Sequence, residues 1–445
     1  MVTLKSFLGM IAAVPFIMAC NQTGQVNATL FPASGSENVN PDTHLVLTFS
    51  ETPVLGDSGM IRVYDAVTDQ VVDSLDLSIP SGPTESRTYG PECDYTKVPY
   101  DYTRTVMPTN KDTRPGTPSG TAEPTPPVYQ LTIIGGFTDA FHFYPVIVRD
   151  SIATIYLHNN MLEYGHTYYV TIDNGVLNLA DGSFQGVTKE DEWVFTTKSD
   201  MPELSDTLIV DVAGKGDFNT VQGALDFIPD FNEQQTVILV NPGDYEELVY
   251  TRNKWHVKIK GAGMADTKVH YANNEVFNPH PLTVKTNEWP GTFPSRRAAF
   301  MLDNCKDIVI EDMTIATDLK GQAEGLLING ERIALYRVHI IGSGDALQAN
   351  GTIYMESCEL DGGGDTILGR GSLFAYKSNF RNGGGPFSWV RNTAGNHGNV
   401  FVECTFSTED GKQADYGRTK SNHGSAYPDA EFVLIDCKVK NIIPE

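Results

Sequence analysis

Asp345 and Asp365 occupy equivalent positions in a sequence pattern that repeats along the C-terminal half of the chain. Asp345 lies seven residues after Val338, and Asp365 lies seven residues after Cys358, where Val338 and Cys358 are themselves equivalent. If the copies stack as neighbouring strands, the backbones of the two aspartates lie about 4.7 to 4.9 Å apart. Two carboxylates this close in a sheltered groove do not both ionise easily, so one pKa rises and that group keeps its proton. The pair therefore offers a nucleophile and a general acid from one residue type.

The strands that would position this pair form a repeat after Met301. The copies read IVIEDMTI, IALYRVHI, IYMESCEL, LFAYKSNF, VFVECTF and FVLIDCKV. Their equivalent inward residues follow one another at intervals of 25, 20, 20, 26 and 33: Met313, Val338, Cys358, Ser378, Cys404 and Cys437. Each copy is a short alternating strand that can bury its apolar face only by stacking on other copies. We therefore predict an all-β protein with a right-handed parallel β-helix over residues 205–445.

Six cysteines are present, with no C-x-x-C pair and no histidine at zinc-finger spacing. The pattern therefore predicts no metal site. Cys358, Cys404 and Cys437 fall on the inward row of the repeat, where a thiol packs as a small apolar plug. A disulfide between neighbouring rungs of the helix is the alternative in a secreted protein.

The N-terminal half has a different character. Stretches such as LFPASGSENVNPDTHLVLTFSETP and GHTYYVTIDNGVLNLADGSFQG alternate short strands with Gly, Asn, Asp and Pro turns, which is typical of a β-sandwich. They resemble bacterial Ig-like domains over residues 28–198. An insertion at about residues 81–144 contains a run rich in Pro, Gly, Ser and Thr, which predicts an exposed loop. The second domain begins near residue 205 with a strand and then Val221, Ala224, Leu225 and Ile228 at helical spacing.

The N-terminus is typical of a targeting signal. Lys5 precedes an apolar run from Phe7 to Ala19 that ends at Cys20. The residues before Cys20 resemble a bacterial lipobox, which implies removal of residues 1–19, a lipid on Cys20 and a tether over residues 20–27. An ordinary cleaved signal with an incidental cysteine is the alternative. We expect a protein of the bacterial cell envelope, an outer-membrane lipoprotein or otherwise extracytoplasmic, that contacts the membrane only through this anchor.

The charge balance argues against nucleic acid as a partner. The chain has 56 acidic and 32 basic residues, a formal net charge of −24, and no basic stripe. Such a field repels phosphates and anionic lipid headgroups. A soluble, acidic and monomeric enzyme is consistent with this composition.

Six motifs in order resemble the motif series of pectin methylesterases. They are VDVAGKGDFNTVQGALDFIP, VILVNPGDYEELVY, HVKIKGAG, GQAEGLLINGER, GDALQANGTIYMESCELDGGGDTILGRG and DYGRTKS. Each motif alone is weak, but six in order on one repeat make a specific signal that covers nearly all of residues 208–445. The resemblance implies a hydrolase that removes methyl esters from pectin (homogalacturonan), with a pectic polysaccharide as its partner.

The resemblance also implies a role for each matching residue. Asp365 matches the nucleophile, Asp345 the acid/base, and Arg418 the arginine that holds the nucleophile ionised. Gln322 matches a glutamine that donates a hydrogen bond to the developing oxyanion. Tyr245 falls in the first motif, where it would line the groove or serve the fold. The implied mechanism proceeds through an acyl-enzyme on Asp365 and needs no metal or organic cofactor.

The chain departs from the family pattern at two places. Gly344 stands where the family has a second glutamine directly before the acid/base, and Thr419 and Lys420 stand where it has Pro-Trp after the arginine. Substrate contacts could instead come from Trp389, Phe387, Lys420 and His423. The sequence ends at Asn-Ile-Ile-Pro-Glu, where the family continues, so we expect a C-terminally truncated product.

Three other functions remain open from the sequence. A pectate lyase would use the same architecture, but it needs an acidic calcium cluster and an arginine base. A non-catalytic carbohydrate-binding β-helix is suggested by Gly344 and Lys420. An esterase that acts on another pectic ester, such as acetyl, would use the same aspartates.

Overall fold

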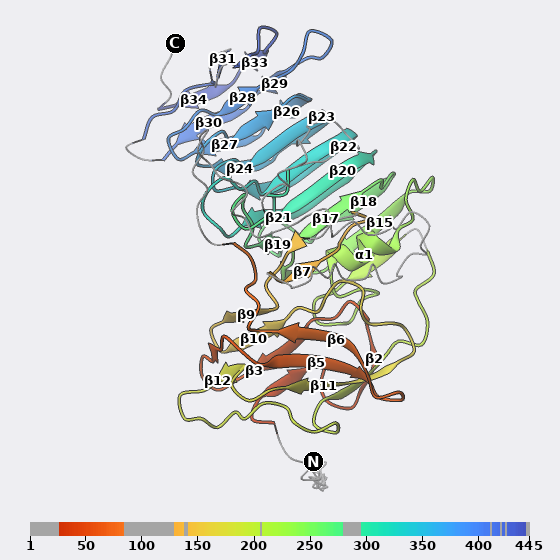
Figure 1. Ribbon diagram of the computed structural model, residues 1–445. Helices are drawn as coiled ribbons and strands as arrows, with labels where there is room; N and C mark the ends of the chain where they lie inside the picture. Colours follow the sequence, from red (N-terminus) through yellow and green to blue (C-terminus); the bar gives the residue numbers. More distant parts are fainter. Residues whose placement is uncertain are drawn as a thin grey trace, which may run out of the picture.

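The structure, a computed structural model, describes residues 26–83, 129–137, 141–204, 207–278, 295–409, 412–418, 421–422 and 425–441. Its strands form a group of mostly antiparallel sheets up to Thr197 and one long sheet from Thr207 onward (Figure 1). The signal peptide expected at residues 1–19, the lipidation site Cys20 and most of the Pro-rich insertion lie outside the described residues. No helix in the described ranges is long and apolar enough to cross a membrane.

The N-terminal strands form two sheets around one apolar core. One sheet contains, in spatial order, β1 (Thr29–Phe31), β3 (Leu45–Thr48), β10 (Ile152–Ile155) and β9 (Val146–Arg149). The other contains β2 (Ser36–Val39), β13 (Val194–Thr197), β11 (Thr167–Ile172), β5 (Met60–Asp65) and β6 (Gln70–Asp76). Small pairs are formed by β4 (Val54–Leu55) with β12 (Leu177–Asn178) and by β7 (Leu131–Thr132) with β8 (Phe141–His142). Alternate residues point inward, as Leu45 and Leu47 do on β3, and they pack against inward residues of the other sheet such as Val63.

The second part of the chain is a parallel β-helix, so the predicted fold class is confirmed for this half. Its sheet has 19 strands, and every pairing within it is parallel. The strands are β14 (Thr207–Val210), β15 (Thr236–Val240), β16 (Gly243–Glu246), β17 (Val249–Arg252), β18 (Val257–Lys260), β19 (Thr267–Tyr271), β20 (Phe300–Lys306), β21 (Val309–Thr317), β22 (Leu326–Ile341), β23 (Leu347–Glu356), β24 (Glu359–Gly362), β25 (Ile367–Gly369), β26 (Ser372–Tyr376), β27 (Asn379–Asn382), β28 (Ser388–Val390), β29 (Asn399–Val402), β30 (Thr405–Thr408), β33 (Phe432–Ile435) and β34 (Lys438–Lys440). A separate hairpin is formed by β31 (Ser421–Asn422) and β32 (Ser425–Ala426).

The predicted inward row lines up in the structure. Met313 pairs with Val338. For Cys358, Ser378, Cys404 and Cys437 the alignment is seen one residue later. Glu359 pairs with Asn379, Asn379 with Thr405, and Thr405 with Lys438. Each residue of the inward row directly follows a residue with positive φ. Examples of these preceding residues are Arg337 (53°), Lys377 (49°) and Glu403 (53°). These left-handed residues turn the chain from one strand of a rung to the next. The described cysteines, Cys305, Cys358, Cys404 and Cys437, are free thiols.

The end of the insertion packs on the β-helix. Phe137 and Phe141 are buried in one cluster with Tyr250 and Tyr271 of the β-helix, and the His142 backbone N–H donates to Asn278 Oδ1 at 2.8 Å. The prediction of an exposed loop over residues 81–144 is therefore wrong for residues 129–137 and 141–144. The Pro- and Thr-rich composition behind that prediction belongs to the stretch outside the described residues, whereas this part carries large apolar side chains.

The two halves of the chain meet at a short helix, α1 (Val221–Phe227), which lies at the end of the β-helix that faces the sandwich (Figure 1). Its N-cap, Thr220, accepts a hydrogen bond from the Gly223 N–H at 2.9 Å. Asp42 of the sandwich accepts from the Thr220 N–H and hydroxyl, both at 2.8 Å. Glu247 of the β-helix accepts from the N–H groups of Val221 (2.8 Å) and Gln222 (2.9 Å). The first turn of α1 is therefore held by carboxylates from both halves.

Candidate active site

The two aspartates lie on neighbouring turns, as the repeat predicts. Asp345 lies in the turn between β22 and β23, and Asp365 lies in the turn between β24 and β25. Each is two residues before a strand residue, Leu347 or Ile367, and these two residues pair with each other. The Asp365 backbone N–H donates to Asp345 Oδ1 at 3.0 Å. Both residues are buried, at 7% and 3% exposure. The carboxyl group of Asp345 is therefore hydrogen-bonded to the backbone of the residue that carries the second buried carboxyl group.

Glycines allow the turns to stack this closely. A Cβ on Gly364 would lie 2.7 Å from the Gly344 carbonyl oxygen, and a Cβ on Gly385 would lie 2.6 Å from the Gly364 carbonyl oxygen. Both distances are too short for a side chain to be accommodated without backbone movement. The glycine-rich turns are thus required by the packing of backbone on backbone at the site.

Arg418 lies against Asp365. Its Nε donates to Asp365 Oδ1 at 2.7 Å and to Oδ2 at 2.8 Å. The Arg418 backbone N–H donates to the Ser388 carbonyl at 2.9 Å, which attaches the arginine to the rung beyond Asp365. Its guanidinium carbon lies 5.1 Å from the centre of the Trp389 ring. The nucleophile predicted from the sequence is therefore paired with the predicted arginine.

The electrostatics separate the two carboxyl groups. Burial raises the pKa of Asp345 to about 7, and Arg297 opposes this while Glu324 and Asp365 add to it. Burial also raises the pKa of Asp365, but the hydrogen bond and charge of Arg418 oppose that rise. Asp345 is therefore the member of the pair that holds a proton near neutral pH, and Asp365 is the member that a cation keeps ionised.

Gln322 is joined to the aspartates through a residue that sequence reasoning missed. Arg297 Nη1 donates to Gln322 Oε1 at 2.5 Å, and Arg297 Nη2 donates to Asp345 Oδ2 at 3.1 Å. The same guanidinium donates to the fully buried Glu324 at 2.6 to 2.9 Å. Arg297 belongs to none of the six motifs, and two adjacent arginines shortly before a strand give no signal of a catalytic role in sequence.

The comparisons with known proteins agree with the motif series over the same part of the chain. Residues 207–383 match the pectinesterase family model. Pectinesterase QRT1 of Arabidopsis thaliana is 28% identical over 194 residues, which is 41% of this chain and 50% of that protein. Probable pectinesterase 67 of the same plant is 27% identical over 182 residues, 39% of this chain and 50% of that protein. The chain thus spans about half the length of the curated relatives it matches.

Solved pectin methylesterases are also similar to part of the chain. The pectin methylesterase PemA from Erwinia chrysanthemi aligns with a TM-score of 0.44 and 17% identity, over 54% of this chain and 81% of that one. The pectin methylesterase from carrot aligns with a TM-score of 0.41 and 15% identity, over 55% of this chain and 88% of that one.

The position of the absent pectinesterase glutamine is closed to any side chain. A Cβ on Gly344 would lie 2.7 Å from the Gly321 carbonyl oxygen and 3.1 Å from the Gln322 Cα. A glutamine at this position would therefore push against the backbone that carries Gln322.

The structure changes the predicted set of substrate-binding residues. Tyr245 is only 2% exposed, and its hydroxyl donates to the Asn241 carbonyl at 2.9 Å, so its assignment to substrate binding is wrong. It packs in the core because its inward position on β16 outweighs its polar hydroxyl. Trp389 is half-buried beside Arg391 and Arg418, with ring-to-guanidinium distances of 4.3 and 5.1 Å. Lys420 and His423 lie outside the described residues.

An open cavity adjoins the turn that contains Asp365. A cavity of about 720 Å³ lies beside the Asp365 turn, lined by Gly363, Gly383, Gly384, Gly385 and Lys412 among others. The bare glycine backbones and one lysine leave room for a polar, extended ligand. Gly363, in the same turn as Asp365, thus borders this cavity, whereas Asp365 itself is not among its lining residues.

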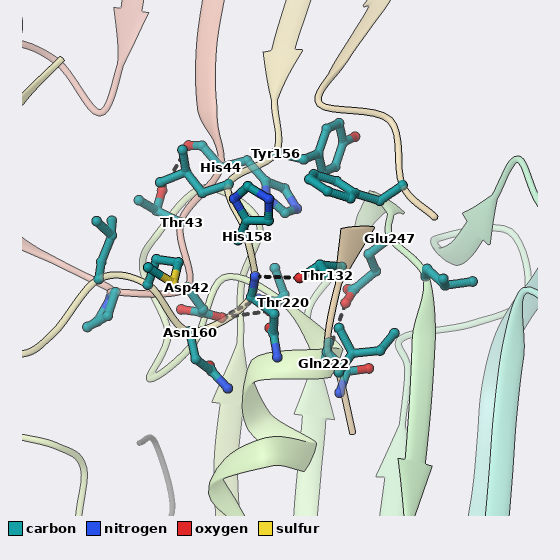
Figure 2. Close-up of a pocket in the computed structure, with 18 of the residues that line it drawn as sticks. Asp42, Thr43, His44, Thr132, Tyr156, His158, Asn160, Thr220, Gln222 and Glu247 are labelled. Atoms are coloured by element: carbon teal, nitrogen blue, oxygen red, sulfur yellow. Dashed lines mark hydrogen bonds between the residues drawn. The ribbon is translucent and has the colours of Figure 1, made fainter. Parts of the chain in front are cut away.

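A second cavity, of about 100 Å³, lies at the seam between the sandwich and α1 (Figure 2). His44, Tyr156, His158 and Glu247 line it. Burial lowers the pKa of His44 to about 4, so this ring is uncharged near neutral pH. None of the residues expected to carry chemistry lines this cavity. We place the candidate active site at Asp345 and Asp365 because these buried residues are hydrogen-bonded to each other and Arg418 contacts Asp365.

One group of side chains has the donor types of a metal site. Glu246, His270 and Asp318 bring their ligand atoms within 4.8 Å of one another. Arg149 of the sandwich already bonds Glu246 and lies 3.4 Å from Asp318. Burial lowers the pKa of His270, but its contacts with Asp244 and Asp318 outweigh burial and raise it to about 9. Two cations therefore neutralise this cluster, which fits an ion-pair network between the two halves of the chain.

Proposed function

We propose that the protein is a carboxylic ester hydrolase that removes methyl esters from pectin through an aspartate nucleophile. The observation that carries the proposal is the hydrogen-bonded pair of buried aspartates, in which Arg418 contacts Asp365 and burial raises the pKa of Asp345 to about 7. The match of residues 207–383 to the pectinesterase family supports the same reaction class. The glycine-lined cavity beside the Asp365 turn has room for part of a polysaccharide chain.

The geometry suggests a two-step reaction. The Asp365 carboxylate attacks the ester carbonyl, and the Gln322 amide stabilises the oxyanion. Collapse of the tetrahedral intermediate breaks the bond to the methoxy group, which takes the proton of Asp345 and departs as methanol. Asp345, now ionised, takes a proton from water as the hydroxide attacks the acyl-enzyme. This step releases the product as a uronic acid, which then loses its proton to solvent, and it frees the Asp365 carboxylate and restores the proton on Asp345.

The remaining parts of the chain fit delivery of this site to an extracellular polysaccharide. We place the protein in the bacterial cell envelope, attached through a lipid on Cys20, with the Ig-like sandwich as a spacer and the enzyme as a monomer. The lipobox-like residues before Cys20 and the two-sheet core of the N-terminal half support this arrangement.

The products released from methyl-esterified and acetylated homogalacturonan test the proposed reaction. The purified protein is expected to release methanol, without acetate and without the ultraviolet absorbance of an unsaturated uronate. Acetate alone would indicate a different pectic ester, and the absorbance would indicate β-elimination by a lyase. Binding of the polymer with none of these products would identify a non-catalytic binding module.

A further inference from the structure

We propose that Arg297 and Glu324 form a positioning pair for ester hydrolysis, in which Arg297 fixes Gln322 and Asp345 and Glu324 fixes Arg297. This proposal rests on the proposed function. A second glutamine at position 344 could not hold the catalytic groups in place, because Gly344 has no room for a side chain. The proposal assigns this positioning to Arg297 and Glu324 instead.

The contacts of Arg297 account for three side chains at once. Its Nε donates to both oxygens of Glu324, at 2.8 and 2.9 Å, and Nη2 adds a third contact at 2.6 Å. Nη2 also reaches Asp345 Oδ2 at 3.1 Å, and Nη1 reaches Gln322 Oε1 at 2.5 Å. A guanidinium is planar and its donors have fixed directions. The buried Glu324 therefore sets the plane in which Gln322 and Asp345 are held.

The contact with Gln322 decides which end of its amide faces the substrate. Its carbonyl oxygen accepts from Arg297, so the NH₂ group is the end left to donate to an oxyanion. If the amide turned over, an oxygen would face the developing negative charge and destabilise it. Arg297 thus acts through Gln322, and the expected loss on disturbing it is in turnover more than in substrate affinity.

The contact with Asp345 fixes the second catalytic group. Asp345 Oδ2 accepts from Arg297 and Oδ1 accepts from the Asp365 N–H, so the carboxyl group cannot rotate freely. The charged groups that face it are Arg297, Glu324, Asp365 and Arg418, and Glu275 lies 3.8 Å from Arg297. Arg297 lowers the pKa of Asp345 and Glu324 raises it. Substitutions at these two positions should therefore move the titration of Asp345 in opposite directions.

The experiment measures the titration of Asp345 and turnover on the full chain. The carboxyl ¹³C signal of Asp345, assigned by its loss in Asp345→Asn, is followed against pH in wild type, Arg297→Met and Glu324→Gln. We expect the pKa to rise by about one unit in Arg297→Met and to fall in Glu324→Gln. Arg332→Gln, which removes an exposed ion pair with Asp307, is the matched control and should change neither the titration nor turnover. Shifts in the same direction, or no shift in either variant, would overturn the proposal.

Arg297→Lys separates positioning from charge and covers the case in which Arg297→Met does not fold. The lysine keeps the charge but not the planar fork, so the pKa of Asp345 should stay near its wild-type value while kcat for methanol release falls at least tenfold and KM changes little. Full turnover in Arg297→Lys would rule out the positioning role. The titration does not require turnover, so a wild-type protein that releases no methanol refutes the proposed function while the titration still tests the effect of the pair on Asp345.

Discussion

Arg418 contacts Asp365, the proposed nucleophile, and removal of this arginine should move the acid limb of the pH-rate profile. The Asp365 side chain is 4% exposed and burial raises its pKa, while the Nε contacts of Arg418 at 2.7 and 2.8 Å oppose that rise. Removing the arginine should therefore let burial raise the pKa of Asp365 further. In Arg418→Ala, Asp365 should remain protonated to higher pH and lose its nucleophilic form earlier as the pH falls.

The size of the shift follows from the surroundings of the pair. A charge pair at about 4 Å in a medium of effective dielectric about 20 is worth about 4 kcal/mol before the costs of desolvation and screening. The Arg418 side chain is 35% exposed, which weakens the interaction, and Arg391 and Arg297 still act on Asp365 when Arg418 is gone. We therefore expect a shift near the lower end of the usual range, about one pKa unit or about 1.4 kcal/mol.

Methanol release measured from pH 4 to 9, in roughly half-unit steps, for wild type, Arg418→Lys and Arg418→Ala tests this reasoning. The acid limb should move to higher pH in Arg418→Ala. In Arg418→Lys the acid limb should lie near its wild-type pH, while the rate should recover less completely because lysine lacks the planar guanidinium. Acid limbs that coincide in all three proteins would show that Arg418 does not set the charge of Asp365.

Three further predictions concern the site and its support. Gly344→Gln should lower turnover and the melting temperature, because its Cβ meets the Gly321 carbonyl oxygen at 2.7 Å, and a gain in turnover would contradict the packing argument. Burial raises the pKa of Glu247 from 4.5 to about 7. The protonated Glu247 therefore stabilises the folded protein fully below pH 4.5, and this stabilisation is lost as the pH rises through 7. The loss in the free energy of unfolding is about 3 kcal/mol. Melting temperatures at pH 5 and 8 should therefore differ less in Glu247→Gln than in wild type, whereas equal differences would refute this. A reductant should change the melting temperature little, because Cys358 and Cys404 are free thiols in the core, and a large drop would reveal a disulfide.

Much of the β-helix follows from its sequence because the inward row is a local pattern. Alternation places Val338 and Cys358 inside, and the interval between them carries Asp345 and Asp365 to adjacent turns. The corners of the rungs could not be predicted in this way. They are formed by ordinary residues such as Lys377 and Glu403 in the left-handed region, where glycine or asparagine is the usual signal.

The sequence predicted the residues of the candidate site that belong to a recognisable motif, and it did not predict the others. Asp365 and Arg418 come from motifs far apart in sequence, and the rungs bring them into contact as expected. Arg297 lies outside every motif, and its role depends on three contacts that only the fold creates. Tyr245 shows the opposite case, because a residue within a motif proved to serve the core rather than the groove.

Methanol release from methyl-esterified homogalacturonan by wild type, Asp365→Asn and Asp361→Asn tests the central claim most directly. Asp361 lies on β24, four residues before the proposed nucleophile, and pairs with His339 and Arg381, so its variant is a control for loss of a nearby carboxylate. We expect wild type and Asp361→Asn to release methanol at similar rates and Asp365→Asn to release none above background, with unchanged circular dichroism in all three. Substantial turnover by a folded Asp365→Asn protein would contradict the assignment of Asp365 as the nucleophile.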